Sequence, residues 1–174
     1  MELDAMRSVK YDYGLDNLQL MVPFCRTPEE GSLVTGLLNE KGVGPASGTD
    51  LFVMVELPSN VIEADRFIEM MDLSGGSIGS NDLVQTVYAV SRDDLEGYQN
   101  PIDARSPSVK AMIRDIVGKF NSKGMEIGIC GQAPSDFPDE FPAFLVDCGI
   151  TSISVTPDTA VAVRGTVAEA EKRA

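Results

Sequence analysis

Five short apolar segments, separated by stretches with helical periodicity, constrain the fold of this 174-residue chain more than any other feature. The segments cover residues 18–24, 51–55, 75–79, 126–129 and 152–155. Strands that alternate with helices usually pair in parallel, so the pattern predicts an α/β fold with a parallel sheet. A doubly wound open sheet and a piece of a (β/α)8 barrel both fit this pattern.

The intervening residues predict helices with recognisable ends. The expected helices cover residues 3–13, 27–42, 58–71, 106–124 and 141–149, and a last helix starts at Thr156–Pro157. Thr27 followed by Pro28 is typical of a helix start, because threonine caps and proline suits the first turn. The stretch from Thr86 to Pro107 is expected to be mostly irregular and either functional or mobile.

Composition excludes several classes of function. The chain has no histidine, which removes Ser-His and Cys-His pairs, His-ligated zinc and any phosphohistidine carried on this chain. Its 27 acidic and 14 basic residues give a net charge of −13, which argues against nucleic-acid binding. No apolar run approaches the roughly 20 residues of a membrane span. Three cysteines do not make a disulfide framework, so we expect a reducing cytoplasm and no membrane.

Polar residues follow the predicted strands at the ends where parallel α/β folds place their sites. Glu56 follows the second strand and Asp82 the third, and two carboxylates in one mouth suit a hard cation such as Mg²⁺. Gly79 and Ser80 would bring backbone N–H groups close to an anion. Cys130, beside a glycine after the fourth strand, would be exposed and could move a proton to or from carbon.

Each of these residues also has a purely structural interpretation. Glu56 could be a helix-terminus charge, Asn81 and Asp82 a helix cap, and Cys130 a small buried hydrophobe. We interpret Cys25, a second thiol at a strand end, as packing. Taken together, the strand-end residues favour Mg²⁺-dependent chemistry on a small oxo acid.

The same residues carry a family resemblance. The segments MVPFCRTPEE, MVELPSNVIEADRF, GSIGSNDL and IGICGQAPSDFPDEFPAFLVDCGITSISVTPDT resemble the C-terminal barrel of the phosphoenolpyruvate (PEP) synthases, also called pyruvate, water dikinases. The match runs in order from about Leu15 to Thr159. It implies a (β/α)8 TIM-barrel-type fold of which residues 1–174 are the C-terminal five βα units, with no ATP-grasp or phosphohistidine domain.

The resemblance also implies residue roles. Glu56 and Asp82 would bind the metal, residues 79–82 would contact the substrate, and Cys130 would donate the proton at the methylene carbon of PEP. The family reaction converts ATP, pyruvate and water to AMP, PEP and phosphate through a phosphohistidine on a mobile domain. Because that domain is missing, we expect this chain alone not to turn over ATP.

Two alternatives stay open at the sequence level. One is a protein similar to enzyme I of the phosphotransferase system or to pyruvate phosphate dikinase, against which the GQAPSD segment counts. The other is a non-catalytic fragment that binds an oxo acid or a partner. Gly76, Val84, Ser91 and Thr156 depart from the family pattern and indicate a divergent member.

An incomplete barrel would leave two open edges. We therefore expect it to associate with itself, with the missing N-terminal domains or with a complementary fragment.

Overall fold

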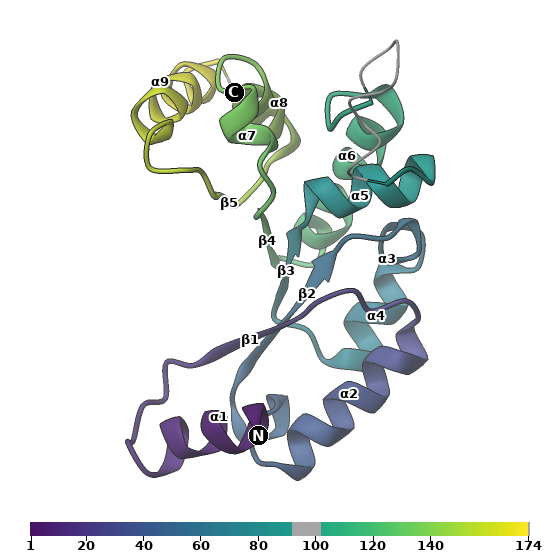
Figure 1. Cartoon of the computed structure of the whole chain (residues 1–174), viewed down its shortest axis with the longest axis vertical. Coiled ribbons are helices and arrows are strands. Elements are labelled where there is room, and N and C mark those ends of the chain that lie inside the picture. Colours follow the sequence, from purple (N-terminus) through teal and green to yellow (C-terminus); the bar gives the residue numbers. More distant parts are fainter. Residues whose placement is uncertain (92–101, 174) are drawn as a thin grey trace.

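Five parallel strands form one sheet in the computed structural model, which describes residues 1–91 and 102–173 (Figure 1). The strands are β1 (Gln19–Val22), β2 (Asp50–Val55), β3 (Gly75–Ile78), β4 (Glu126–Ile129) and β5 (Ser152–Ile153). They lie side by side in chain order. A doubly wound sheet reverses its order at a switch point, whereas a barrel adds each strand beside the last. The strand order therefore supports the barrel segment over the doubly wound alternative.

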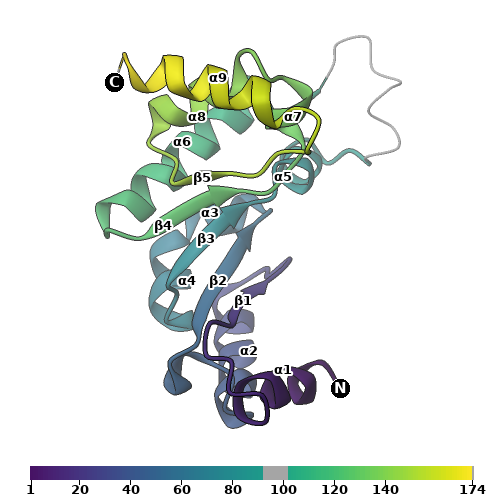
Figure 2. The same cartoon turned by 90° about the vertical axis from the view of Figure 1, so that its left-hand side faces the viewer.

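Helices connect the strands and form a continuous layer beside the sheet (Figure 2). They are α1 (Glu2–Tyr11), α2 (Pro28–Glu40), α3 (Pro58–Ile62), α4 (Ala64–Met71), α5 (Ser80–Tyr88), α6 (Pro107–Ser122), α7 (Ala133–Asp136), α8 (Phe141–Cys148) and α9 (Ala160–Glu171), with a 3-10 turn at Pro45–Ser47. Along this layer α2 contacts α4, α4 contacts α6, α6 contacts α8 and α8 contacts α9. No helix within the described residues has the length and hydropathy needed to cross a membrane.

Alternate residues of each strand divide the sheet into two faces. On β2, Leu51, Val53 and Val55 are buried, whereas Phe52 and Met54 are half-buried. Strand pairing places Val55, Ile78 and Ile129 in one row, so they share the buried, helix-covered face. The residues one position further along, Glu56, Gly79 and Cys130, therefore point to the opposite face, at the carboxyl ends of the strands.

Several helix boundaries differ from the sequence predictions. The stretch expected to be irregular begins inside α5, which continues to Tyr88 and buries Leu83 and Val84. Residues 92–101 of that stretch lie outside the described residues. The last helix starts at Ala160 instead of Thr156, because the Thr159 N–H bonds to the Thr156 carbonyl in a preceding turn.

Other predictions are confirmed or refined. The Thr27 hydroxyl accepts the N–H of Glu30 at 3.1 Å, which is the expected cap of α2. The helix predicted over 58–71 is interrupted at Glu63, whose φ of −99° and ψ of 22° separate α3 from α4. The fifth strand is shorter than predicted, since it pairs with β4 only through residues 152 and 153.

Candidate active site at the carboxyl ends of the strands

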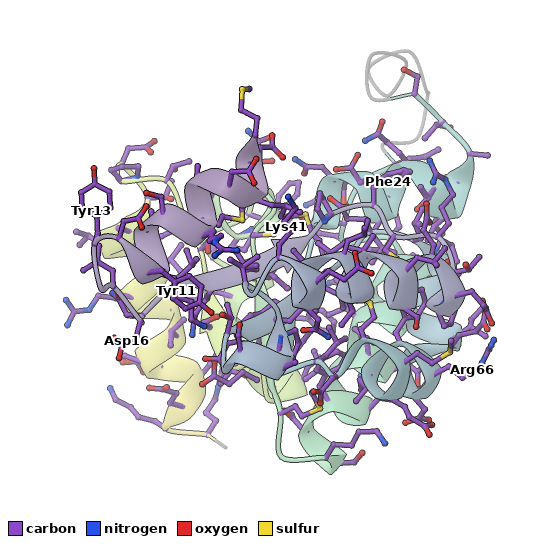
Figure 3. All side chains as sticks on the ribbon, turned by 90° about the horizontal axis from the view of Figure 1, so that it is seen from below. Tyr11, Tyr13, Asp16, Phe24, Lys41 and Arg66 are labelled. Carbon is purple, nitrogen blue, oxygen red and sulfur yellow. The ribbon has the colours of Figure 1, made fainter. Side chains whose placement is uncertain are left out.

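Glu56 leaves the end of β2 almost completely buried, at 5% exposure. Its Oε2 accepts the backbone N–H of Phe24 at 2.8 Å. Phe24, labelled in Figure 3, has a φ of +48°, a left-handed conformation that is uncommon for an aromatic residue. Strained backbone of this kind tends to gather at functional sites. The residue with the strained backbone, Phe24, is therefore the same residue whose N–H binds the Glu56 carboxylate.

The loop after β2 is held by one buried side chain, that of Asn60. Its Oδ1 accepts the N–H groups of Glu56 at 3.1 Å and Leu57 at 3.0 Å. Its Nδ2 donates to the carbonyl of Cys25 at 2.8 Å, at the end of β1. Asn60 therefore ties the ends of β1 and β2 together beneath the Glu56 carboxylate.

Asp82 lies in the first turn of α5, directly after β3, and is half-buried. Gln85 Nε2 donates to its Oδ1 at 3.1 Å. The Thr86 hydroxyl oxygen lies 2.8 Å from the Glu56 carbonyl oxygen and 2.9 Å from that of Asp82. Thr86 thus links the backbones of the two segments that carry the carboxylates.

The electrostatics of this pair favour a cation. Burial raises the pKa of Glu56, and the negative charge of Asp82 raises it further, while the hydrogen bond from Phe24 lowers it. Both effects that raise the pKa penalise the ionised form of Glu56. A positive ion next to both carboxylates would remove that penalty.

The donor set fits Mg²⁺ with open positions for other ligands. Within residues 1–91 and 102–173, no three or more His, Cys, Asp or Glu side chains come together as a metal cluster. Mg²⁺ is commonly held by one or two carboxylates and completes its shell with water and substrate oxygens. Glu56 and Asp82 match that pattern.

Gly79 and Ser80 join β3 to α5 and are closely packed. A Cβ on Gly79 would lie 2.6 Å from Glu56 Cγ, so any larger residue at position 79 would displace the Glu56 side chain. Ser80 is 0% exposed, and its buried hydroxyl has no hydrogen-bond partner in the described part of the chain. A Cβ on Gly131 would lie 1.8 Å from that hydroxyl. Ser80 therefore packs under the loop that follows Cys130 and is closed to solvent, whereas Asn81 is half-buried.

Cys130 is exposed at the end of β4, as its glycine neighbour predicted, so its interpretation as a buried hydrophobe is wrong. Its N–H donates to the Ile78 carbonyl at 3.0 Å, which continues the β3–β4 ladder. Cys25, by contrast, is 2% exposed, and burial raises its pKa. The structure thus separates an accessible thiol from a packed one.

The sheet brings Glu56, Asp82 and Cys130 to one mouth, whereas Ser80 is buried below it. Neighbouring strands are about 4.8 Å apart, so Glu56 and Cys130, two strands apart on one face, have backbones about 10 Å apart. That span leaves room for a small oxo acid between their side chains. Sequence reasoning missed Phe24, Asn60 and Thr86, which position the carboxylates. Phe24 acts through its backbone N–H and therefore leaves no side-chain signal.

Comparison with known proteins identifies the family. Residues 1–172 match the family described as PEP-utilising enzyme, PEP-binding domain. The chain is 44% identical over 174 residues to a phosphoenolpyruvate synthase of Aquifex aeolicus and 37% identical over 174 residues to that of Escherichia coli. These alignments cover 99% of this chain but only 20% and 21% of the relatives, so the chain spans about a fifth of their length.

A solved structure shares the fold. A citrate lyase from Burkholderia xenovorans superposes with a TM-score of 0.66 at 15% sequence identity, covering 95% of this chain and 53% of the lyase chain. At that identity the likeness concerns the fold alone. The sequence match over residues 1–172 is what assigns the chain to a family: it belongs to the PEP-utilising enzymes, as their PEP-binding domain.

Proposed function

We propose that this chain is the part of a phosphoenolpyruvate synthase that binds pyruvate or PEP and exchanges the proton at the substrate's C3. The observation that carries this proposal is the shared mouth of Glu56, Asp82 and Cys130. The match to synthases from Aquifex aeolicus and Escherichia coli favours this family over enzyme I-like relatives. The ATP-dependent reaction would belong to the longer protein.

Each residue at the mouth has a definite task in this proposal. Glu56 and Asp82 would hold Mg²⁺, which supplies the positive charge that stabilises an enolate. Asn81, beside them at the start of α5, would donate to a substrate oxygen. The Cys130 thiol would donate its proton to C3 of the enolate to form pyruvate, and its thiolate would remove a methyl proton in the opposite direction.

The remaining part of the longer protein would complete the barrel. The face of the sheet opposite the helices is only partly covered, and Met21 on the edge strand β1 is 41% exposed. Leu33 and Leu37, on the outer side of α2, are 73% and 56% exposed. We propose that further βα units, or a complementary fragment, cover these surfaces. The cytoplasm, where free cysteines stay reduced, is the compartment we propose.

Calorimetric titration of oxalate, a planar mimic of the pyruvate enolate, tests the site directly. We expect Mg²⁺-dependent binding to the wild-type chain and its loss in Asp82→Ala. Asp16→Ala is the matched control, because Asp16 is exposed on the loop before β1 (Figure 3). A folded wild-type chain that binds no oxalate with Mg²⁺ would show that this chain does not form the site by itself.

A further inference from the structure

A second cavity lies on the far side of the Cys130 thiol from the carboxylates. It has a volume of about 180 Å³ and lies between the loops that follow β4 and β5. Its polar side chains are Cys130, Gln132, Ser135, Ser154 and Thr156, and we call it the hydroxyl pocket. Since β4 lies between β3 and β5, Cys130 separates this pocket from the mouth formed by Glu56, Gly79 and Asp82.

The hydroxyl pocket is polar but carries no protein base. Among the described residues, its lining contains no carboxylate, amine or guanidinium, and the thiol is the one ionisable group. A cavity of this size has room for several water molecules. Hydroxyl groups both accept and donate hydrogen bonds, so they can order such water.

Two serines give the pocket its shape. The Ser135 hydroxyl accepts the N–H of Thr156 at 2.9 Å and the hydroxyl of Thr159 at 3.1 Å, which joins the loop after β4 to the start of α9. Ser154 continues β5, and its N–H donates to the Ile129 carbonyl at 3.0 Å, so it lies beside Cys130 in the ladder. Its hydroxyl forms no hydrogen bond within the described residues and is exposed.

A thiol that moves protons to and from a substrate must also exchange its proton with solvent. Cys130 is exposed in the free chain. In the proposed reaction the substrate covers the thiol from the carboxylate side, so the proton must leave on the other side. We propose that the hydroxyl pocket is the route by which the Cys130 proton reaches solvent, and that Ser154 positions the water that carries it. This inference rests on the proposed function of Cys130 and extends it to Ser154, which follows β5, and to Ser135 of α7.

The proton balance is simple. The thiolate takes a proton from the methyl group of pyruvate, the C–H electron pair stays on the enolate, and an S–H bond forms. In D2O, pocket water removes that proton and supplies a deuteron to the sulfur. Return of the deuteron to C3 gives singly deuterated pyruvate and HDO.

Proton NMR of pyruvate in D2O with Mg²⁺ tests the inference on the full chain. We expect Ser154→Ala to slow the loss of the methyl signal about tenfold, a modest part of what positioned proton transfer contributes. Ser154→Thr keeps the hydroxyl and should keep the rate. Ser152→Ala is the matched control, because Ser152 lies in β5, two residues before Ser154, and outside the pocket.

Added imidazole separates proton transfer from a structural effect. A small base in the pocket should restore exchange in Ser154→Ala, and alkylation of Cys130 by iodoacetamide without metal should proceed as in wild type. Normal exchange in Ser154→Ala would overturn this inference alone. Slow exchange that imidazole does not restore, with altered alkylation, would overturn it in favour of a structural role. Absence of exchange in wild type would refute the proposed function of this chain and this inference with it.

Discussion

Replacing Gly79 with alanine should weaken the metal site without straining the backbone. Gly79 has a φ of −83° and a ψ of 83°, so alanine meets no left-handed conformation there. The added Cβ would lie 2.6 Å from Glu56 Cγ, whereas ordinary van der Waals contact begins at 3.4 Å, so the side chain of Glu56 must retreat by 0.8 Å. A displacement of that size disrupts the geometry of the 2.8 Å hydrogen bond that the Phe24 N–H donates to Glu56 Oε2.

The size of the effect follows from that hydrogen bond. A bond to a charged group contributes about 1.5–3 kcal/mol, and each 1.4 kcal/mol is a factor of ten in affinity. We therefore expect Mg²⁺-dependent oxalate binding by Gly79→Ala to be about 10–100-fold weaker, the usual effect of disturbing groups that orient metal ligands. Isothermal titration calorimetry at fixed Mg²⁺ measures this difference.

Gly118→Ala is the matched control. Gly118 lies inside α6, and a Cβ there meets nothing within 4 Å. Alanine should leave oxalate binding unchanged and stabilise the helix by up to about 1 kcal/mol. If Gly79→Ala folds cooperatively and binds oxalate as tightly as wild type, the close packing of Gly79 on Glu56 has no part in the site.

Three further substitutions test the same mouth. Glu56→Gln removes the ionised carboxylate, whose folded form is penalised by a raised pKa, so without metal the variant should need more urea to unfold at pH 7 than wild type. This difference should vanish as the pH falls below 4.5, the ordinary pKa of glutamate. Equal urea midpoints at pH 7 would contradict the prediction. Thr86→Val should cost about 1–3 kcal/mol of unfolding free energy, because carbonyls at the site lose their donor, and Thr86→Ser should restore it. Cys130→Ser should abolish methyl exchange of pyruvate while oxalate affinity stays unchanged; loss of both would mean that the thiol binds instead of transferring a proton.

The chemistry of the mouth was predictable because it follows from strand ends. Glu56 and Cys130 come directly after an apolar segment and Asp82 comes three residues after one, and the carboxyl ends of parallel strands meet at one edge. The glycine-rich third strand was harder to predict, since glycine disfavours strands. Its packing explains it: a Cβ on Gly75 would lie 2.5 Å from the Phe52 ring, and one on Gly76 would lie 3.0 Å from the Phe120 ring.

What the sequence could not predict depends on contacts between distant segments. The choice between an open sheet and a barrel segment lies in the strand order, which local patterns do not encode. The burial of Ser80 arises from its contact with Gly131 on another loop. A helix cap at Asn81 and Asp82 was one interpretation of the sequence, but the length of α5 was not predicted, because it depends on burying Leu83 and Val84 in the core.

Three energetically unfavourable features converge on the mouth. Phe24 has a left-handed backbone, Glu56 has a raised pKa in a nearly buried position, and the Ser80 hydroxyl is buried without a partner among the residues that the structure describes. Each of these features lowers the free energy of unfolding of the chain, compared with a variant in which the feature is removed. The Phe24 backbone and the raised pKa both concern the Glu56 carboxylate. A cation bound between Glu56 and Asp82 would turn the unfavourable energy of the ionised Glu56 carboxylate into a favourable one. The same burial that destabilises ionised Glu56 in the free chain would therefore strengthen its attraction for a bound ion, which is the arrangement expected of a site selected for binding instead of stability.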